Sequence, residues 1–304
     1  MSERIALNLP LADVALDRDY LSRTREFLFE ELMTNSLTKV LVMHEQKVLL
    51  TSDNELKFFS PDTAPPAGLM VYLGKTVSDA HPIVLQIVEA THAAEIEPNP
   101  ELWHHLRRSG IGLSSAEAAI FTQALALANW HESHRFCSSC GLETVVQKAG
   151  WVRFCKSERK EIYPRTDPAI IVGVIDEQDR ILLGSQGIWE ENRYSILAGF
   201  VEPGESLEAA VIREMQEEAG ILVHDPEFLG SQAWPFPFSL MFGYTAKFSG
   251  GEAIPDGEEI VKLRWFTRDE LKAESHSLLL PGKLSIARSI IEHWLGEELP
   301  EQDR

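Results

Sequence analysis

Short apolar runs separated by polar turns dominate the first third of the chain. Residues 38–51 hold two such runs on either side of Glu45-Gln46, and residues 68–74 hold another, so this region predicts short β-strands. The pattern changes at residues 114–131, where apolar side chains recur at helical spacing after a serine pair. Together these patterns predict an amino-terminal α/β domain over residues 1–131.

The same alternation returns further along the chain. Residues 169–175 and 181–183 are apolar and flank the polar pair Glu177-Gln178, as the first two runs flank Glu45-Gln46. The likeness indicates either a decayed internal duplication or two short hairpins that match by chance. We expect a second α/β domain over residues 166–304.

All three cysteines lie between these two regions. Cys137 and Cys140 are three positions apart, and Cys155 follows a predicted pair of short strands, which is the layout of a zinc ribbon. A complete ribbon would have a fourth cysteine at position 158, where this chain has Glu158. Residues 132–165 therefore form a zinc-ribbon-like segment that either binds zinc through Cys137, Cys140, Cys155 and Glu158 or keeps its fold without metal.

Composition and charge exclude several classes of protein. The chain has 47 acidic and 28 basic side chains, a net charge of −19, so it is not a protein that holds a polyanion or an anionic membrane mainly by neutralising phosphates. No apolar run approaches the ~20 residues of a membrane-spanning helix, and the amino terminus lacks a signal-peptide pattern. An odd number of clustered cysteines suits a reducing compartment. We expect a cytoplasmic protein without membrane contact.

Three glutamates mark the candidate chemistry. A helix is predicted to begin at Ser206 and end at Gly220. Glu214, Glu217 and Glu218 have the spacing i, i+3, i+4, so their carboxylates share one helix face and repel one another unless a cation binds between them. Carboxylate oxygens suit Mg²⁺ or Mn²⁺, and these ions suit diphosphate oxygens. The alternative is a solvated acidic face.

Residues 199–221 resemble the Nudix box at every specified position: glycine, five residues, glutamate, seven residues, Arg-Glu, then Glu-Glu and a closing glycine. The resemblance implies a metal-dependent hydrolase of nucleoside diphosphates. It also implies a fold in the α/β class, a Nudix α/β/α sandwich preceded by a smaller α/β domain and a zinc-ribbon-like insert. The glutamates implied as metal ligands are Glu214, Glu217 and Glu218, and the implied brace of loop and helix is Glu205 with Arg213.

A second motif resembles a signature of the NADH pyrophosphatases. Residues 231–239 read Ser-Gln-Ala-Trp-Pro-Phe-Pro-Phe-Ser, and only Ala233, where that family has proline, departs from its pattern. Rigid aromatic rings between prolines can stack on a base, although such a loop is also typical of simple packing. The resemblance implies a further carboxylate, Glu259. It implies a dinucleotide site lined by Tyr163, Ala198, Phe200, Gln232, Ala233, Trp234, Pro235, Phe236, Pro237, Phe238, Ser239 and Ala287.

The activity implied by these resemblances is hydrolysis of the pyrophosphate of NADH or NAD⁺ to nicotinamide mononucleotide and AMP. Removal of an NAD cap from RNA is implied as well, and so is a homodimer. Glu218 or Glu259 would accept a proton from the attacking water. Two alternatives stay open: a Nudix hydrolase of ADP-ribose or diadenosine polyphosphates, and a regulator that binds dinucleotides without cleaving them.

Overall fold

The computed structural model describes residues 9–66 and 68–300, which fall into two compact units. The amino-terminal unit comprises residues 13–166 together with residues 235–238. The carboxy-terminal unit comprises the described residues up to 12, residues 167–234 and residues 239–300. No helix among the described residues has the length and apolar character needed to cross a membrane.

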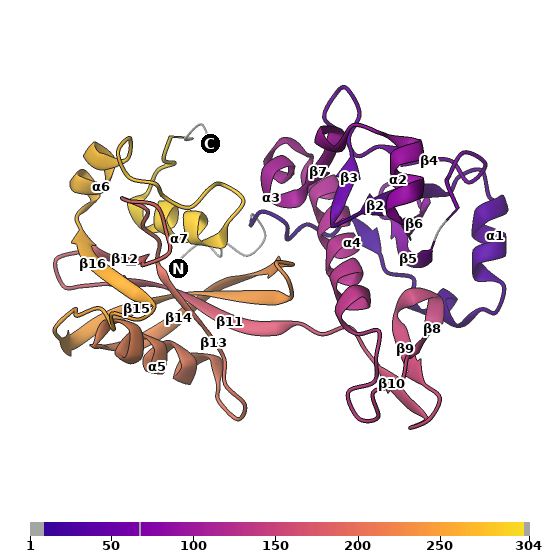
Figure 1. Cartoon of the computed structure of the whole chain (residues 1–304). Helices are drawn as coiled ribbons and strands as arrows, with labels where there is room; N and C mark the ends of the chain where they lie inside the picture. The colour runs from indigo at the N-terminus through magenta and orange to yellow at the C-terminus, as the bar shows by residue number, and fades with distance from the viewer. Residues whose placement is uncertain (1–8, 67, 301–304) are drawn as a thin grey trace. The chain divides into compact units, whose positions relative to one another are not determined.

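The amino-terminal unit is built on a sheet of seven described strands in the order β1-β5-β6-β2-β3-β7, with β4 paired to β2 (Figure 1). The predicted hairpin is present as β2 and β3, and Glu45 and Gln46 form its turn at positive φ. The strands are β1 (Leu16–Asp17), β2 (Lys39–His44), β3 (Lys47–Leu49), β4 (Phe58–Phe59), β5 (Leu69–Thr76), β6 (Pro82–Ile87) and β7 (Trp103–His105).

One long helix belongs to the same unit. It begins where the sequence predicts, because the Ser114 side chain accepts a hydrogen bond from the Glu117 amide, and the Glu117 carboxylate accepts one from the Ser114 amide. The helices are α1 (Leu28–Thr34), α2 (Ala90–Ile96), α3 (Leu106–Ser109) and α4 (Ser115–Ser133), with 3-10 turns η2 (Tyr20–Thr24), η3 (Pro100–Leu102) and η4 (Gly110–Gly112).

The cysteine segment forms its own small sheet within this unit. Strands β8 (Val145–Gln147), β9 (Val152–Cys155) and β10 (Lys160–Ile162) pair antiparallel in the order β10-β9-β8. The 3-10 turn η5 (Lys148–Gly150) joins the first two strands. Cys155 thus ends the central strand, as the predicted ribbon requires.

The carboxy-terminal unit has a second sheet, in the order β14-β15-β11-β12-β16, with β13 paired to β11. Strand β11 runs parallel to β15 and antiparallel to β12 and β13. The elements are β11 (Asp167–Ile175), β12 (Ile181–Gln186), β13 (Leu197–Phe200), α5 (Leu207–Ala219), β14 (Ile221–Trp234), β15 (Ser239–Gly251), β16 (Ile260–Phe266), α6 (Arg268–Glu274) and α7 (Ile286–Leu295).

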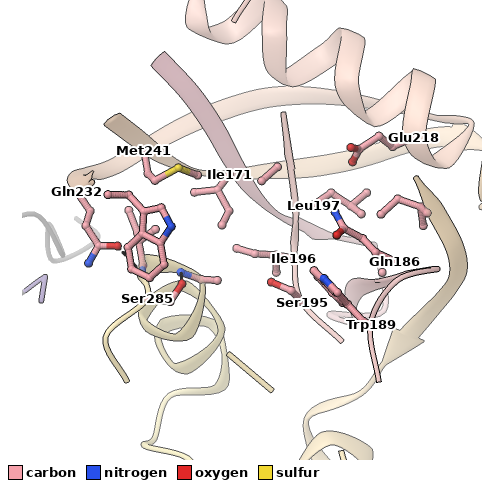
Figure 2. A pocket seen from close by; sticks show the side chains of 16 residues that line it. Ile171, Gln186, Trp189, Ser195, Ile196, Leu197, Glu218, Gln232, Met241 and Ser285 are labelled. Atoms are coloured by element: carbon pink, nitrogen blue, oxygen red, sulfur yellow. Dashed lines mark hydrogen bonds between the residues drawn. The ribbon is translucent and has the colours of Figure 1, made fainter. Parts of the chain in front are cut away.

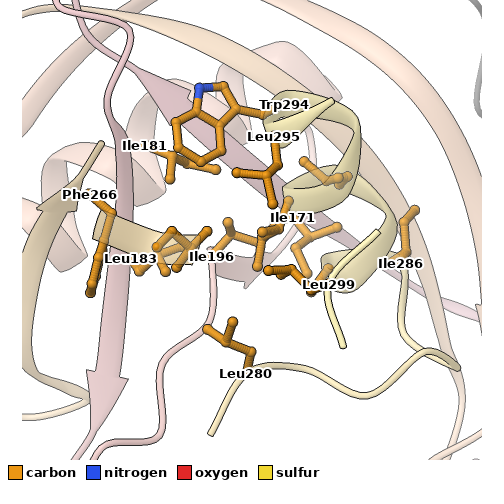
Figure 3. Packing of buried hydrophobic residues seen from close by; sticks show 14 of the residues in the cluster. Ile171, Ile181, Leu183, Ile196, Phe266, Leu280, Ile286, Trp294, Leu295 and Leu299 are labelled. Carbon is orange, nitrogen blue, oxygen red and sulfur yellow. The ribbon is translucent and has the colours of Figure 1, made fainter. Parts of the chain in front are cut away.

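Alternating side chains of β11 make this sheet the middle layer of a sandwich. Ile170 and Val172 pack in one apolar cluster with Val211 and Met215 of α5. Ile171, which points to the opposite face, packs in a second cluster that contains Ile286, Ile290 and Trp294 of α7 (Figure 3). One helix therefore covers each face, which confirms the expected α/β/α sandwich.

Candidate active site

The helix that carries the glutamates has defined ends. The Ser206 side chain accepts a hydrogen bond from the Ala209 amide at 3.1 Å and so caps the first turn of α5. Gly220 ends the helix with φ of 67°, a left-handed conformation that favours glycine. Gly199 on β13 matters for a different reason, because a β-carbon there would displace the Glu214 carboxylate from its position. The predicted helix boundaries are confirmed.

Arg213 ties the preceding loop to this helix. Its guanidinium donates to both oxygens of Glu205, at 2.8 and 2.9 Å, and to the Phe200 carbonyl at 2.9 Å. The same group donates to Glu214 at 2.9 Å and to Glu217 at 2.8 Å. The paired Arg213 lowers the pKa of Glu205 to about 2, so that carboxylate stays ionised. One arginine thus offsets part of the repulsion among the carboxylates.

Glu218 is the exception, because it is only 5% exposed and the hydrogen bonds of Arg213 go to Glu205, Glu214, Glu217 and Phe200 instead. Its Oε2 is buried without a hydrogen-bond partner among the described residues. Burial, together with the charges of Glu214 and Glu259, raises its pKa to about 8. An ionised carboxylate here requires a nearby cation. The carboxylates of α5 therefore fit a divalent ion with oxygen ligands.

Glu259 approaches this group from outside the helix. The Asp256 carboxylate accepts hydrogen bonds from the amides of Glu259 and Ile260, at 3.3 and 2.8 Å, and so shapes the loop before β16. The Gln186 side chain donates to Glu259 Oε1 at 3.3 Å. Gln186 was not among the predicted site residues. It lies at a shift in register between β12 and β16, and no sequence motif signals such a bulge.

A cavity of about 160 Å³ lies beside Glu218 within the carboxy-terminal unit (Figure 2). Four of the residues predicted to bind substrate line it: Ala198, Gln232, Trp234 and Ala287. The lining side chains that were not among the predicted site residues include Gln186, Trp189, Ser195, Met241 and Ser285. Gln232 and Trp234 of the aromatic motif therefore line the same cavity as Glu218 of the carboxylate helix.

Gln232 forms a fixed part of this cavity wall. Its amide nitrogen donates to the carbonyls of Pro10, at 2.6 Å, and Leu284, at 3.0 Å. Its amide oxygen accepts from the Ile286 amide at 2.9 Å. Gln232 is 1% exposed, so its hydrogen bonds hold α7 and β14 together at the cavity.

The tip of the aromatic motif has different surroundings. Residues 235–238 belong to the amino-terminal unit, where the buried Asn129 amide donates to the carbonyls of Pro235, at 3.0 Å, and Pro237, at 3.2 Å. The Phe236 ring lies 4.3 Å from the Arg107 guanidinium carbon, and the Phe238 ring lies 5.5 Å from that of Arg165. These rings are absent from the cavity lining.

The other predicted substrate residues also lie outside the cavity lining. Phe200 on β13 is 60% exposed and Tyr163 is 59% exposed. The Tyr163 hydroxyl donates to Glu161 in the amino-terminal unit. Ala233 pairs with Leu240 and Ser239 pairs with Trp234 where β14 meets β15, and neither Ala233 nor Ser239 lines the cavity.

The three cysteines form a separate cluster. Their sulfur atoms all lie within 4.8 Å of one another, and among the described residues no further histidine, cysteine or carboxylate joins them. Backbone amides of Cys140 and Ser139 lower the pKa of Cys137 to about 7, which favours the thiolate that zinc requires. The Glu158 amide donates to Cys155 Sγ at 3.4 Å, while the Glu158 carboxylate is not part of the cluster. Three sulfur ligands are therefore in place for a structural zinc ion.

Comparison with known families divides the chain in three. Residues 37–130 match the NADH pyrophosphatase-like rudimentary NUDIX domain. Residues 132–163 match the NADH pyrophosphatase zinc ribbon domain, and residues 164–285 match the NUDIX domain. Among solved structures, a Nudix hydrolase from Nitrosomonas europaea is similar at a TM-score of 0.42 and 22% identity, over 54% of this chain and 95% of that one.

Curated relatives match most of the chain. The NAD-capped RNA hydrolase NudC of Mycobacterium tuberculosis is 40% identical over 276 residues, 86% of this chain and 85% of that protein. The protein of the same name from Pseudomonas syringae is 37% identical over 72% of this chain and 75% of its own length. With the carboxylate helix, the sandwich and the cysteine cluster, this similarity shows that the chain belongs to the NADH pyrophosphatase family of Nudix hydrolases.

Proposed function

We propose that this protein hydrolyses the diphosphate bond of NADH or NAD⁺ to nicotinamide mononucleotide and AMP, and that it removes the NAD cap from RNA. The observation that carries the proposal is Glu218, a buried carboxylate with an unpartnered oxygen at a cavity that Trp234 also lines. Relatives named NAD-capped RNA hydrolases support the choice of substrate. The net charge of −19 indicates that the body of an RNA adds little affinity.

In this proposal the residues of α5 hold the metal and the diphosphate together. Glu214, Glu217 and Glu218 would hold Mg²⁺ or Mn²⁺, and the bound ion would supply polarisation of the phosphoryl oxygens and a lower pKa for the attacking water. Glu218 or Glu259 accepts the proton of the water that attacks phosphorus, and Gln186 orients Glu259. Arg213 and Glu205 keep the loop and helix in register during the reaction.

The base of the nicotinamide half is placed by the opposite part of the cavity. We infer that Trp234 stacks on the nicotinamide ring, with Gln232, Ala198 and Ala287 as the surrounding wall. The remaining predicted substrate residues are Tyr163, Phe200, Ala233 and the segment from Pro235 to Ser239, and their role in binding is part of this proposal.

We also propose a homodimer that works in the reducing cytoplasm. Two large exposed rings support the dimer, because Tyr163 and Phe200 are more than half exposed and exposed aromatic side chains are enriched at interfaces. Three free cysteines support the reducing compartment. In this assembly Cys137, Cys140 and Cys155 hold zinc, and Glu158 or a water molecule completes the ligand set.

A substrate panel tests the function. The purified protein is given NADH, NAD⁺, ADP-ribose, a diadenosine polyphosphate and NAD-capped RNA, each with Mg²⁺ and with Mn²⁺, and the products are identified. We expect nicotinamide mononucleotide and AMP from NADH at the highest kcat/KM. Faster cleavage of ADP-ribose would favour the alternative hydrolase, and tight binding of NADH without cleavage would favour the regulator.

A further inference from the structure

A second tryptophan, Trp189, lines the active-site cavity, and no sequence motif predicted it. Strand β12 ends at Gln186, and the Trp189 amide donates to the Gln186 carbonyl at 3.1 Å, which closes a tight turn. Within this turn Ile188 is 92% exposed, whereas Trp189 is half-buried against the cavity. The turn therefore presents one ring to the cavity and leaves its neighbour in solvent.

This turn lies on the carboxylate side of the cavity. Figure 2 shows Gln186, Trp189 and Ser195 grouped below Glu218, with Gln232, Met241 and Ser285 at the other end of the view. The hydrogen bond from Gln186 to Glu259 fixes the start of the turn to a carboxylate of the site. Trp189 is therefore linked to the carboxylates through Gln186: the Trp189 amide donates to the Gln186 carbonyl, and the Gln186 side chain donates to Glu259.

The size of the cavity decides how much of a dinucleotide it encloses. Its volume of about 160 Å³ is below the roughly 300–1,000 Å³ of pockets that enclose whole ligands. The cavity therefore does not enclose a whole dinucleotide, and part of the substrate extends beyond it. Trp189 and Trp234 are the aromatic side chains among the described residues that line this cavity, so the chain offers two rings for two bases.

We propose that Trp189 is the stacking platform for the purine base of the substrate, on the far side of the diphosphate from Trp234. The inference rests on the proposed function and adds to it the recognition of the AMP half. Each base that stacks on an aromatic side chain gains affinity of roughly 5- to 140-fold.

Binding of the two products tests this without any turnover. AMP and nicotinamide mononucleotide are titrated calorimetrically into the Mg²⁺-loaded full chain, into Trp189→Ala and into Trp189→Phe. We expect Trp189→Ala to weaken AMP roughly 5- to 140-fold and to leave nicotinamide mononucleotide within about twofold. Phenylalanine keeps a stacking face and should retain most of the AMP affinity. Ile188→Ala, in the same turn but exposed, is the matched control and should bind both products like the parent protein.

Equal weakening of both products in Trp189→Ala would overturn the proposal, because the ring would then shape the whole cavity. Unchanged AMP affinity would overturn it as well. If Trp189→Ala does not fold, which its melting curve reports, Trp189→Leu and Trp189→Phe provide the comparison, with loss of AMP affinity expected only in the leucine variant.

Hydrolysis gives a second, crossed test. In Trp189→Ala, kcat/KM should fall for NADH and ADP-ribose, which both contain adenine, and should hold for an NADH analogue without the purine base. Equal losses on all three substrates would contradict purine stacking. Failure of the proposed function looks different, because the parent protein would then not cleave NADH while the loss of AMP binding in Trp189→Ala would still be measurable.

Discussion

Six strands of the amino-terminal sheet, all except β1, have the same order as the six strands of the carboxy-terminal sheet, but only the carboxy-terminal unit carries the cluster of glutamates. In the amino-terminal sheet β2 runs parallel to β6 and antiparallel to β3 and β4, while β5 pairs β6 and β7 pairs β3. In the carboxy-terminal sheet β11, β12, β13, β14, β15 and β16 repeat each of these pairings with the same orientations. This topology supports the internal duplication that the two similar hairpins suggested.

The connection that carries the glutamates has no helical counterpart in the amino-terminal sheet. Between β13 and β14 the chain forms α5, which carries the three glutamates. At the equivalent place, between β4 and β5, the described residues 60–66 and 68 form no helix. Pro61, Pro65 and Pro66 lie in that segment, and prolines so closely spaced disfavour a helix. The sheet is therefore a scaffold in both units, and the candidate chemistry depends on the helix inserted into one of them.

The largest effect should come from removing carboxylates from α5, the helix that the amino-terminal sheet lacks at the equivalent connection. We predict that Glu217→Gln and Glu218→Gln each lower kcat by 10²-fold or more, because each removes an anionic metal ligand and the charge stabilisation it supports, on the order of 3 kcal/mol. Initial rates with NADH under Mg²⁺ and Mn²⁺ measure the loss.

Glu227→Gln on β14 is a matched control, because it removes an exposed carboxylate outside the cavity lining and should keep the parent rate. Normal turnover in both α5 variants would show that the difference between the two units is not the source of activity.

A smaller loss of activity is expected when Trp234 is removed, and it should depend on the substrate. We predict that Trp234→Ala lowers kcat/KM for NADH by roughly 5- to 140-fold and affects ADP-ribose much less, because only NADH has a nicotinamide ring to stack. Competition between the two substrates measures the ratio directly. A matched loss on both substrates would assign Trp234 to the shared adenosine half or to packing.

We also expect ionised Glu218 to lower the stability of the metal-free carboxy-terminal unit. Its pKa is about 8 in the folded, metal-free protein against 4.5 for an ordinary glutamate. The folded state therefore holds its proton more tightly, so stability is highest below about pH 4.5 for this group and is lost as pH rises towards 8. We predict that Glu218→Gln raises the melting temperature of the metal-free protein at pH 8, on the order of 5 °C, and much less at pH 5.

Calorimetric melting curves with and without Mg²⁺ check this stability difference. Glu217→Gln is the control, since the Glu217 side chain is 60% exposed and its replacement should change the melting temperature little. Added Mg²⁺ should stabilise the parent protein and have little effect on Glu218→Gln. We expect the parent protein to lose stability relative to Glu218→Gln between pH 5 and pH 8. If it does not, Glu218 is not a buried carboxylate that needs a cation when ionised.

The sequence predicts local features of this molecule better than it predicts long-range ones. Periodicity and capping residues place α4 and α5, since Ser114, Ser206 and Gly220 act within a few residues of themselves. The cavity is assembled from segments far apart in the chain, so Trp189 and Gln186 carry no local signal. The aromatic motif shows the same limit, because Trp234 lines the cavity while Phe236 and Phe238 pack in the other unit.

The smallest effect on activity should come from the zinc ribbon, which belongs to neither large sheet. If the chemistry is confined to the carboxy-terminal sheet and α5, removing zinc and restoring Mg²⁺ should leave NADH hydrolysis within about twofold. Before chelation, the purified protein should contain about one zinc per chain by elemental analysis, because its three cysteine sulfur atoms lie within 4.8 Å of one another.

The missing fourth ligand makes this site sensitive to position 158. We predict that Glu158→Cys slows zinc transfer to a chelator, because a fourth thiolate replaces a weaker ligand, while Glu158→Ala exchanges zinc at least as fast as the parent protein. Ser157→Cys adds a thiol one residue away and is the matched control, with no slowing expected. If hydrolysis is lost in step with zinc release in all of these proteins, the chemistry is not confined to the carboxy-terminal sheet and α5. It would then depend on the zinc ribbon as well.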